Sequence, residues 1–452
     1  MNEVVRSFTK NFIKYFFYIA VFAQIVSGTV YLVCNFNGYT TYPETETVLE
    51  AARAFLFDEY TGVLYPVFIR LCLWLGTVSG ISYYIFVYIV QMVLWIVAAW
   101  YVVKPFFSKK EKWVAIMFAI TNPMCMQTIF SVSLFALKTV FGLFIFGAMF
   151  RLWNQKEKVD VPAMAVLLMS FFLAVFHQPD DVIVWLIPSV VVLAVIFFRK
   201  RVCAVRKKIG LLLTVIGILV ITLFVTGACI EKGSHGRAEK SIEFTLFQKT
   251  VWPDMGEKYT FLPTGIREKI SQEKAYATDE YAESFVMEIG PILEKEYGID
   301  KAKELYWQAV ITQLQYNKRN LANSLVSDFV GYMLEPYSSV WHMSGKSGSA
   351  FGKLYGLMLN NGEKSVHTYW CISFVTMFLL ALYTCIDMVK RNVAGKNALK
   401  KAFPGVILLV YLAIVYTLVN VQGVDYRYSL LHVILYSVFG LFCFWKERNT
   451  QC

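Results

Sequence analysis

The stretch SGISYYIFVYIVQMVLWIVAAWYVV (residues 79–103) contains no charged side chain. A run of about 20 apolar residues is long enough to cross the hydrocarbon core of a bilayer as an α-helix. Further apolar runs of this kind cover residues 13–34, 113–131, 133–152, 161–177, 182–198, 209–230, 366–388, 404–421 and 428–445. The sequence therefore predicts an all-α polytopic membrane protein with about ten transmembrane helices.

The composition of the chain agrees with this interpretation. Apolar residues make up 57% of the sequence and charged residues only 17%, whereas about 25% of the residues in ordinary soluble proteins are charged. The first apolar run follows Arg6, Lys10 and Lys14 and has no small-residue cleavage site, so we expect a membrane helix and not a removed signal peptide. An ordinary soluble protein is excluded.

The positions of lysine and arginine predict the orientation, because these residues accumulate in cytoplasmic segments of membrane proteins. More than half of them lie in the two termini and in alternate connectors, at residues 104–112, 151–158, 199–208 and 390–401. The net charge of +11 therefore indicates a multi-pass protein of the cytoplasmic membrane with both termini cytoplasmic. It does not indicate a nucleic-acid partner.

The predicted helices divide the chain into three parts. They are an N-terminal transmembrane module of about seven helices (1–230), an extracytoplasmic helical domain (231–365) and a C-terminal transmembrane module of about three helices (366–452). Apolar spacing in the middle part predicts amphipathic helices interrupted at Gly290-Pro291 and Gly298. We interpret this part as a small helical cap, with a separate catalytic domain as the alternative. Aromatic residues typical of a membrane interface occur in it at Trp307, Tyr316, Tyr332 and Trp341.

The first outer loop, residues 35–78, is rich in carboxylates for so uncharged a chain. Its acids are Glu44, Glu46, Glu50, Asp58 and Glu59. Apolar spacing after Pro43 predicts a short interfacial helix over residues 43–57. Glu44 and Glu46 then lie in its first turn, where the helix dipole favours carboxylates, which is also the simplest structural explanation for them. The following apolar stretch, 64–76, is short for a span and predicts a second interfacial or re-entrant helix.

Other ionisable residues lie near the predicted outer ends of helices. They are Lys138, His177, Asp180, Asp181, Asp425 and Arg427. Ionisable groups at membrane depth are costly unless they are paired, hydrated or in use, so each is a functional candidate. Structural explanations stay open. Lys138 can extend outward to water, and Arg427 can pair with Asp425. The two aspartates at 180 and 181 can solvate a turn and favour the start of a helix.

Sequence patterns of soluble enzymes are absent, including HExxH, GxSxG, a helix-opening GxGxxG and metal-spaced cysteines and histidines. Gly345-Lys346-Ser347 ends like a phosphate-binding loop, but Val340 occupies the position of the required first glycine. The five histidines are dispersed. We therefore assign no cofactor and no metal ligands, although a divalent metal is left open.

Several short features together resemble the GT-C superfamily of integral-membrane glycosyltransferases. They are an N-terminal helix that leads into a large outer loop, PETETVLEAAR (43–53), Tyr65-Pro66 entering an apolar stretch, His177-Gln178-Pro179 at the third outer turn, a late soluble insertion and Arg427-Tyr428 at the head of a late helix. The nearest branch is that of the protein O-mannosyltransferases and lipid A aminoarabinose transferases, or family 39. Two departures are Glu44, where relatives commonly have aspartate, and the second outer loop, 121–133, which lacks the acid of many relatives.

The resemblance implies that an inverting enzyme transfers a sugar from a polyprenyl-phosphate donor to an envelope acceptor, outside the cytoplasmic membrane. It assigns the role of general base to Glu44, with Glu46 as the second choice. Arg427 and Lys138 would then stabilise the departing phosphate, because guanidinium and ammonium groups are its usual ligands. The supporting residues would be His177, Asp180, Asp181 and Asp425.

Two other classes of function stay open from the sequence. In a multi-pass transporter or lipid flippase, Lys138, His177 and the pair Asp180-Asp181 would line a path through the membrane. The sequence shows no two-fold internal repeat, and its polar residues gather at one face instead of the midplane, which disfavours transport. A non-catalytic scaffold in envelope assembly is the second alternative.

Overall fold

The computed structural model describes part of the 452-residue chain. The described residues are 22, 26, 43–57, 61–107, 109–121, 123–154, 160–178, 182–198, 217, 242–251, 255–275, 290, 292–316, 318–334, 407–418, 430–432, 434–435 and 438. Every regular element among them is a helix, so the prediction of an all-α protein is confirmed. These residues fall into two compact units, one built mainly from residues before 232 and the other from residues 232–339 with 410–426.

Four predicted apolar runs are helices of nearly the predicted extent. They are α4 (Tyr83–Val103), α7 (Leu134–Asn154), α8 (Val161–His177) and α9 (Val182–Phe198). By length and composition, Tyr83–Val103 and Leu134–Trp153 can each cross a membrane, and shorter apolar helices occupy Leu64–Ser79, Val161–His177 and Ile407–Leu418. The runs 13–34, 209–230, 366–388 and 428–445 lie wholly or mostly outside the described residues, so the ten-helix topology stays a prediction.

The predicted single helix over 113–131 is wrong. The structure has two helices there, α5 (Lys109–Ile120) and α6 (Pro123–Ile129). Proline has no backbone N–H and its ring clashes with the preceding turn, so Pro123 cannot continue α5, whereas it is well suited to open α6. With 12 residues, α5 is about 18 Å long, which is too short to cross a bilayer.

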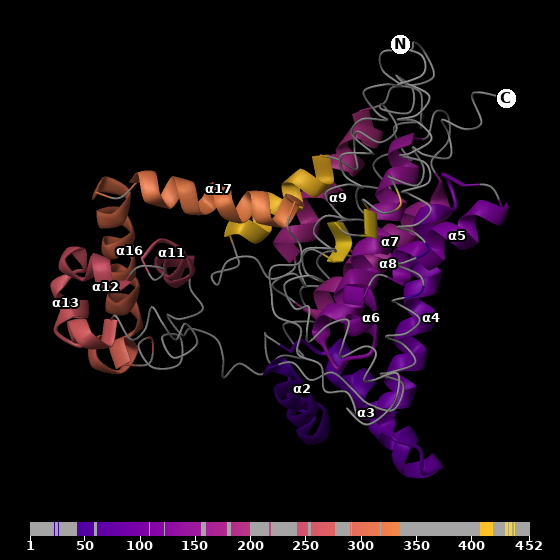
Figure 1. Ribbon diagram of the computed structural model, residues 1–452, viewed down its shortest axis with the longest axis horizontal. Helices are drawn as coiled ribbons and strands as arrows, with labels where there is room; N and C mark the ends of the chain where they lie inside the picture. The colour runs from indigo at the N-terminus through magenta and orange to yellow at the C-terminus, as the bar shows by residue number, and fades with distance from the viewer. Residues whose placement is uncertain are drawn as a thin grey trace, which may run out of the picture. The chain divides into compact units, whose positions relative to one another are not determined.

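In the first unit, α7 is the central helix. It packs against α4, α8 and α9, which run beside it in Figure 1, and its side chains are buried along almost the whole length. Two glycines permit this packing. A Cβ at Gly147 would lie 2.7 Å from Tyr101 Cδ1, and one at Gly142 would lie 3.0 Å from Trp185 Cζ2.

The first outer loop forms two helices, α2 (Pro43–Ala54) and α3 (Leu64–Ser79), so helices are confirmed in both predicted places. The α2 helix ends earlier than predicted, because Phe55 adopts a positive φ of 57°. Arg70 of α3 donates to the carbonyl oxygens of Ala52 and Arg53, at 3.2 and 3.1 Å, and its guanidinium covers the Phe55 ring. Arg70 therefore caps the last turn of α2, where carbonyl groups lack partners within the helix.

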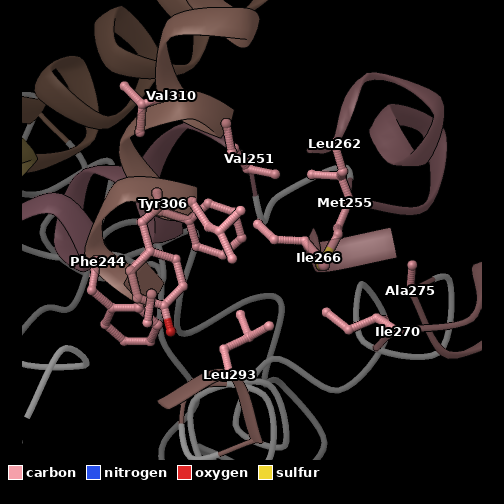
Figure 2. Close-up of a cluster of buried hydrophobic side chains, with 14 residues drawn as sticks. Phe244, Val251, Met255, Leu262, Ile266, Ile270, Ala275, Leu293, Tyr306 and Val310 are labelled. Atoms are coloured by element: carbon pink, nitrogen blue, oxygen red, sulfur yellow. The ribbon is translucent and has the colours of Figure 1, made fainter. Parts of the chain in front are cut away.

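The second unit is a separate helical bundle. Its described helices include α11 (Ile242–Thr250), α12 (Met255–Lys258), η5 (Tyr259–Phe261), α13 (Thr264–Arg267), α16 (Ile299–Tyr316) and α17 (Lys318–Leu334). Figure 2 shows its buried cluster, in which the Tyr306 ring lies 4.9 Å from Phe244 and 5.1 Å from Phe247. The predicted interruption at Gly298 is confirmed, because this residue adopts a φ of +78° just before α16. The interfacial position predicted for Tyr332 is wrong: its side chain is fully buried and packs on Tyr416.

An ion pair between Lys249 and Asp328 joins α11 to α17. Both side chains are well covered, with 4% and 16% of their surfaces exposed. Removing one partner of such a pair strands a charge in a poorly solvated place. We expect Asp328→Asn to destabilise the protein by about 3 kcal/mol, measured as a lower melting temperature of the full-length protein. Glu304→Gln, which removes the exposed pair with Lys301, should change the free energy of unfolding by less than about 0.5 kcal/mol. Equal effects would contradict this account.

Candidate functional site

Residues 129–134 comprise the last residue of α6, the connection to α7 and the first residue of α7, and side chains of three other helices meet there. Gln91 Nε2 of α4 donates to the carbonyl oxygens of Ile129 and Ser131, at 2.7 and 3.1 Å. Thr45 Oγ1 of α2 donates to Val132 O at 2.9 Å. His177 Nε2 of α8 lies 2.8 Å from Leu134 O. Irregular backbone is buried here, and these side chains satisfy its carbonyl groups.

We call this region the polar junction. It consists of the side chains of Thr45, Tyr65, Gln91, Lys138, His177 and Gln178 together with the backbone of residues 129–134. Every one of the six side chains is at least nine-tenths buried. The junction brings together the first, second and third predicted outer connectors, which are far apart in the sequence.

The backbone of the first loop enters the junction at Gly62. The N–H of Val63 donates to Phe176 O at 3.1 Å, which ties the loop to the end of α8. Gly62 has a φ of +63°, and a Cβ there would overlap the carbonyl oxygen of His177 and lie 2.6 Å from its carbon. Only glycine fits this close backbone contact.

His177 fixes the start of α7 against the end of α8. A carbonyl oxygen can only accept, so the contact with Leu134 O requires the proton on Nε2. The imidazole is fully buried and meets the rings of Tyr65 and Phe141 edge to face, at 5.6 and 5.8 Å between centroids. Within the described part of the chain, His177 Nδ1 has no hydrogen-bond partner. These contacts favour a positioning role for His177.

Gln91 is the amide that connects the first loop to the second. Its Oε1 accepts from the Tyr65 hydroxyl of α3 at 3.0 Å, while its Nε2 binds the two carbonyl groups of the 129–134 segment. A buried amide with both ends occupied rigidifies the groups around it, because each lost bond would leave a polar atom buried without a partner.

Replacing Gln91 with leucine should therefore cost about 3 kcal/mol, because it removes the hydrogen bonds to the buried Ile129 and Ser131 carbonyl groups and the one from the Tyr65 hydroxyl. The measurement is the melting temperature of the purified protein. Tyr65→Phe, which removes only one of these hydrogen bonds, should cost about 1 kcal/mol. If the two variants melted at the same temperature, Gln91 would not hold the second outer segment.

Lys138 supplies the positive charge of the junction. Its side chain is only 7% exposed, and Nζ donates to Gln178 Oε1 at 3.2 Å while lying 5.3 Å from the centroid of the Phe135 ring. The structural explanation of Lys138 was that its ammonium extends outward to water. The burial of the side chain contradicts that explanation. A cation held in a poorly solvated place interacts strongly with an anion that reaches it.

Glu44 and Glu46 occupy the first turn of α2, as predicted. They flank Thr45, whose hydroxyl anchors this turn to Val132 O. The Glu46 side chain is exposed, as is that of Glu50 one turn later. This hydrogen bond holds the N-terminus of α2 against the polar junction. The backbone of Glu44 and that of Glu46 therefore lie beside the junction.

The remaining predicted site residues lie outside the described residues. They are Asp180, Asp181, Asp425 and Arg427, and the acids Asp58 and Glu59 of the first loop lie outside as well. The meeting of Arg427 with the first loop therefore stays a prediction. Across the described ranges, no three His, Cys, Asp or Glu side chains are grouped so that they could hold a metal ion.

Sequence reasoning missed four residues that build the junction and its surroundings: Thr45, Gly62, Arg70 as a cap, and Gln91. One signal was available for Gln91, which is the only amide side chain in the apolar helix α4. The partners of all four lie at least 17 residues away in sequence, so the contacts themselves have no local signature.

Comparison of the chain with models of protein families, with curated proteins and with solved structures found no match to any of them. The function therefore rests on the residues and their geometry.

Proposed function

We propose that the chain is a polytopic glycosyltransferase of the cytoplasmic membrane, with its long apolar helices as the transmembrane segments. Both termini are cytoplasmic, and the active site and the 231–365 domain are on the outer side. The enzyme transfers a sugar, with inversion, from a polyprenyl-phosphate donor to an acceptor of the cell envelope. No resident cofactor is assigned.

The exposed faces of two helices support the membrane part of this proposal. On α4 the exposed apolar residues Ile89, Val93, Val97 and Trp100 follow one helical stripe. On α3 a second stripe consists of Val67, Leu71, Trp74 and Val78. Apolar stripes this long are rare on the surfaces of soluble monomers, and contact with lipid tails explains them.

One observation carries the proposal. Hydrogen bonds from α2, α4 and α8 converge on the 129–134 segment, and Lys138 lies in the same junction. Three of the connectors that the topology assigns to the outer side are thus joined in one junction of the first unit. A transferase with a donor at the outer leaflet needs its acid and its phosphate ligand on this same side.

The proposed reaction uses the charged residues that the resemblance assigns to the site. A hydroxyl of the acceptor attacks the anomeric carbon, the bond between that carbon and the phosphate oxygen breaks, and the electron pair leaves with the polyprenyl phosphate. Glu44, or Glu46 as the second choice, takes the hydroxyl proton. Lys138 and Arg427 stabilise the charge that develops on the departing phosphate. Attack from the face opposite the leaving group inverts the anomeric configuration.

The test of the general base uses vesicles with purified protein and radiolabelled polyprenyl-phosphate sugar. Glu44→Gln should lower sugar transfer by about 100-fold or more, because the amide cannot accept the proton. Glu50→Gln on the same helix is the matched control and should transfer at the wild-type rate. Wild-type turnover in Glu44→Gln would move the role to Glu46, and wild-type turnover in Glu46→Gln as well would remove the role from the first turn of α2.

A further inference from the structure

The second unit carries an exposed aromatic patch on the second half of α16. It consists of Phe261, Trp307, Ile311, Leu314 and Tyr316. Trp307, Ile311 and Leu314 follow one another at four- and three-residue spacing, so they share one face of the helix. The Tyr316 ring, 71% exposed, stacks on Phe261 of η5 with 5.7 Å between centroids. The buried cluster of the second unit uses other residues of α16, among them Tyr306 and Val310, which Figure 2 shows.

Charge along the chain changes sharply at this patch. The first turns of α16 are polar, with Asp300, Lys301 and Glu304 among their exposed residues. From Leu305 to Ser327 the sequence has no acid, and its only charges are Lys318 and Arg319, both exposed. The aromatic patch is therefore followed directly by two cations, the combination found where proteins meet anionic headgroups.

The helix that follows the patch, α17, packs near its end on the apolar helix Ile407–Leu418. The α17 helix starts at Lys318, is about 25 Å long and exposes Val326 and Val330. Near its other end, the ring of Tyr332 lies 6.0 Å from that of Tyr416, which belongs to the apolar helix Ile407–Leu418. A single helix thus connects the patch to a segment that we assign to the membrane.

We infer that the aromatic patch, with Lys318 and Arg319, docks on the outer leaflet of the bilayer. The rings enter the headgroup region, and the two cations bind anionic phosphate groups of the lipids. The second unit is then held against the membrane surface by its own contacts and not only by its connections to the rest of the chain. This inference needs the membrane topology of the proposed function but not the transfer of a sugar.

The test is photocrosslinking of the full-length protein in vesicles of phosphatidylglycerol and phosphatidylethanolamine. Trp307→p-benzoylphenylalanine and Ile311→p-benzoylphenylalanine place the probe in the patch, and Lys301→p-benzoylphenylalanine places it at the exposed polar end of the same helix. We expect at least tenfold more lipid adduct from the two patch positions than from position 301, read as the mass of the labelled peptides.

A second arm tests the cations. Lys318→Glu combined with Arg319→Glu should lower the yield of phosphatidylglycerol adduct at position 307 at least threefold. Equal lipid adduct at positions 301, 307 and 311 would overturn the inference, as would adducts to protein in place of lipid at both patch positions. Retention of the protein in membranes after carbonate extraction, measured in parallel, distinguishes a failed docking surface from a failed membrane topology.

Discussion

Replacing Gly62 with alanine is expected to abolish folding of the protein into its membrane-competent form. The new methyl group would overlap the His177 carbonyl group, which belongs to backbone and cannot turn aside. Alanine would also be strained at a φ of +63°. Both effects act where the first loop meets α8, so we expect a loss of more than about 4 kcal/mol. The measurement is the yield and melting temperature of monodisperse protein.

Gly80 provides the matched control. It has a similar φ of +71°, but a Cβ there would meet no atom within 4 Å. Gly80→Ala should therefore show only the strain of the left-handed conformation, about 1 kcal/mol. If Gly62→Ala were as stable as Gly80→Ala, the close contact between the first loop and α8 would be wrong.

Replacing Lys138 with methionine is expected to remove sugar transfer while leaving the protein folded. Methionine has a similar length and no charge, so the packing around Phe135 is kept and the cost of burying an ammonium disappears. The departing phosphate loses a cation in a poorly solvated place, which we expect to lower the turnover at least 100-fold. The assay is transfer from radiolabelled polyprenyl-phosphate sugar, with the melting temperature as a check of folding.

Two further variants separate charge from structure. Lys138→Arg keeps the positive charge and should retain part of the activity. Lys104→Met removes an exposed lysine that covers the Trp100 ring at the end of α4 and should transfer sugar at the wild-type rate. Wild-type turnover in Lys138→Met would assign Lys138 a purely structural role.

Local sequence patterns predicted most of the helices, because each helix has its own apolar run or its own proline at the start. The Val161–His177 helix has the predicted bounds, and the α2 helix begins at the predicted Pro43. The error at 113–131 has a local cause as well: hydropathy alone joined two helices that Pro123 separates. Proline should have outweighed the continuous apolar run.

The candidate site was predicted as a set of residues but not as a geometry. The sequence placed Lys138 and His177 at the same face, and the structure joins Lys138 to Gln178 and His177 to Leu134. Which amide holds Lys138, and which backbone atoms accept from Gln91, depends on packing between segments about 40 residues apart. The spacing of apolar residues predicts only which face of its own helix a residue occupies. It cannot predict which residues of two different segments form a hydrogen bond.

The central claim is that the protein uses a sugar carried on a polyprenyl phosphate, and the mass of the lipid it binds tests this most directly. Full-length protein would be purified in lipid nanodiscs, and its bound lipids would be measured by mass spectrometry for the wild type and for Lys138→Met. We predict that the wild type retains a polyprenyl-phosphate sugar and that the variant retains at least tenfold less. Bulk phospholipid alone, in equal amounts for both proteins, would contradict the account.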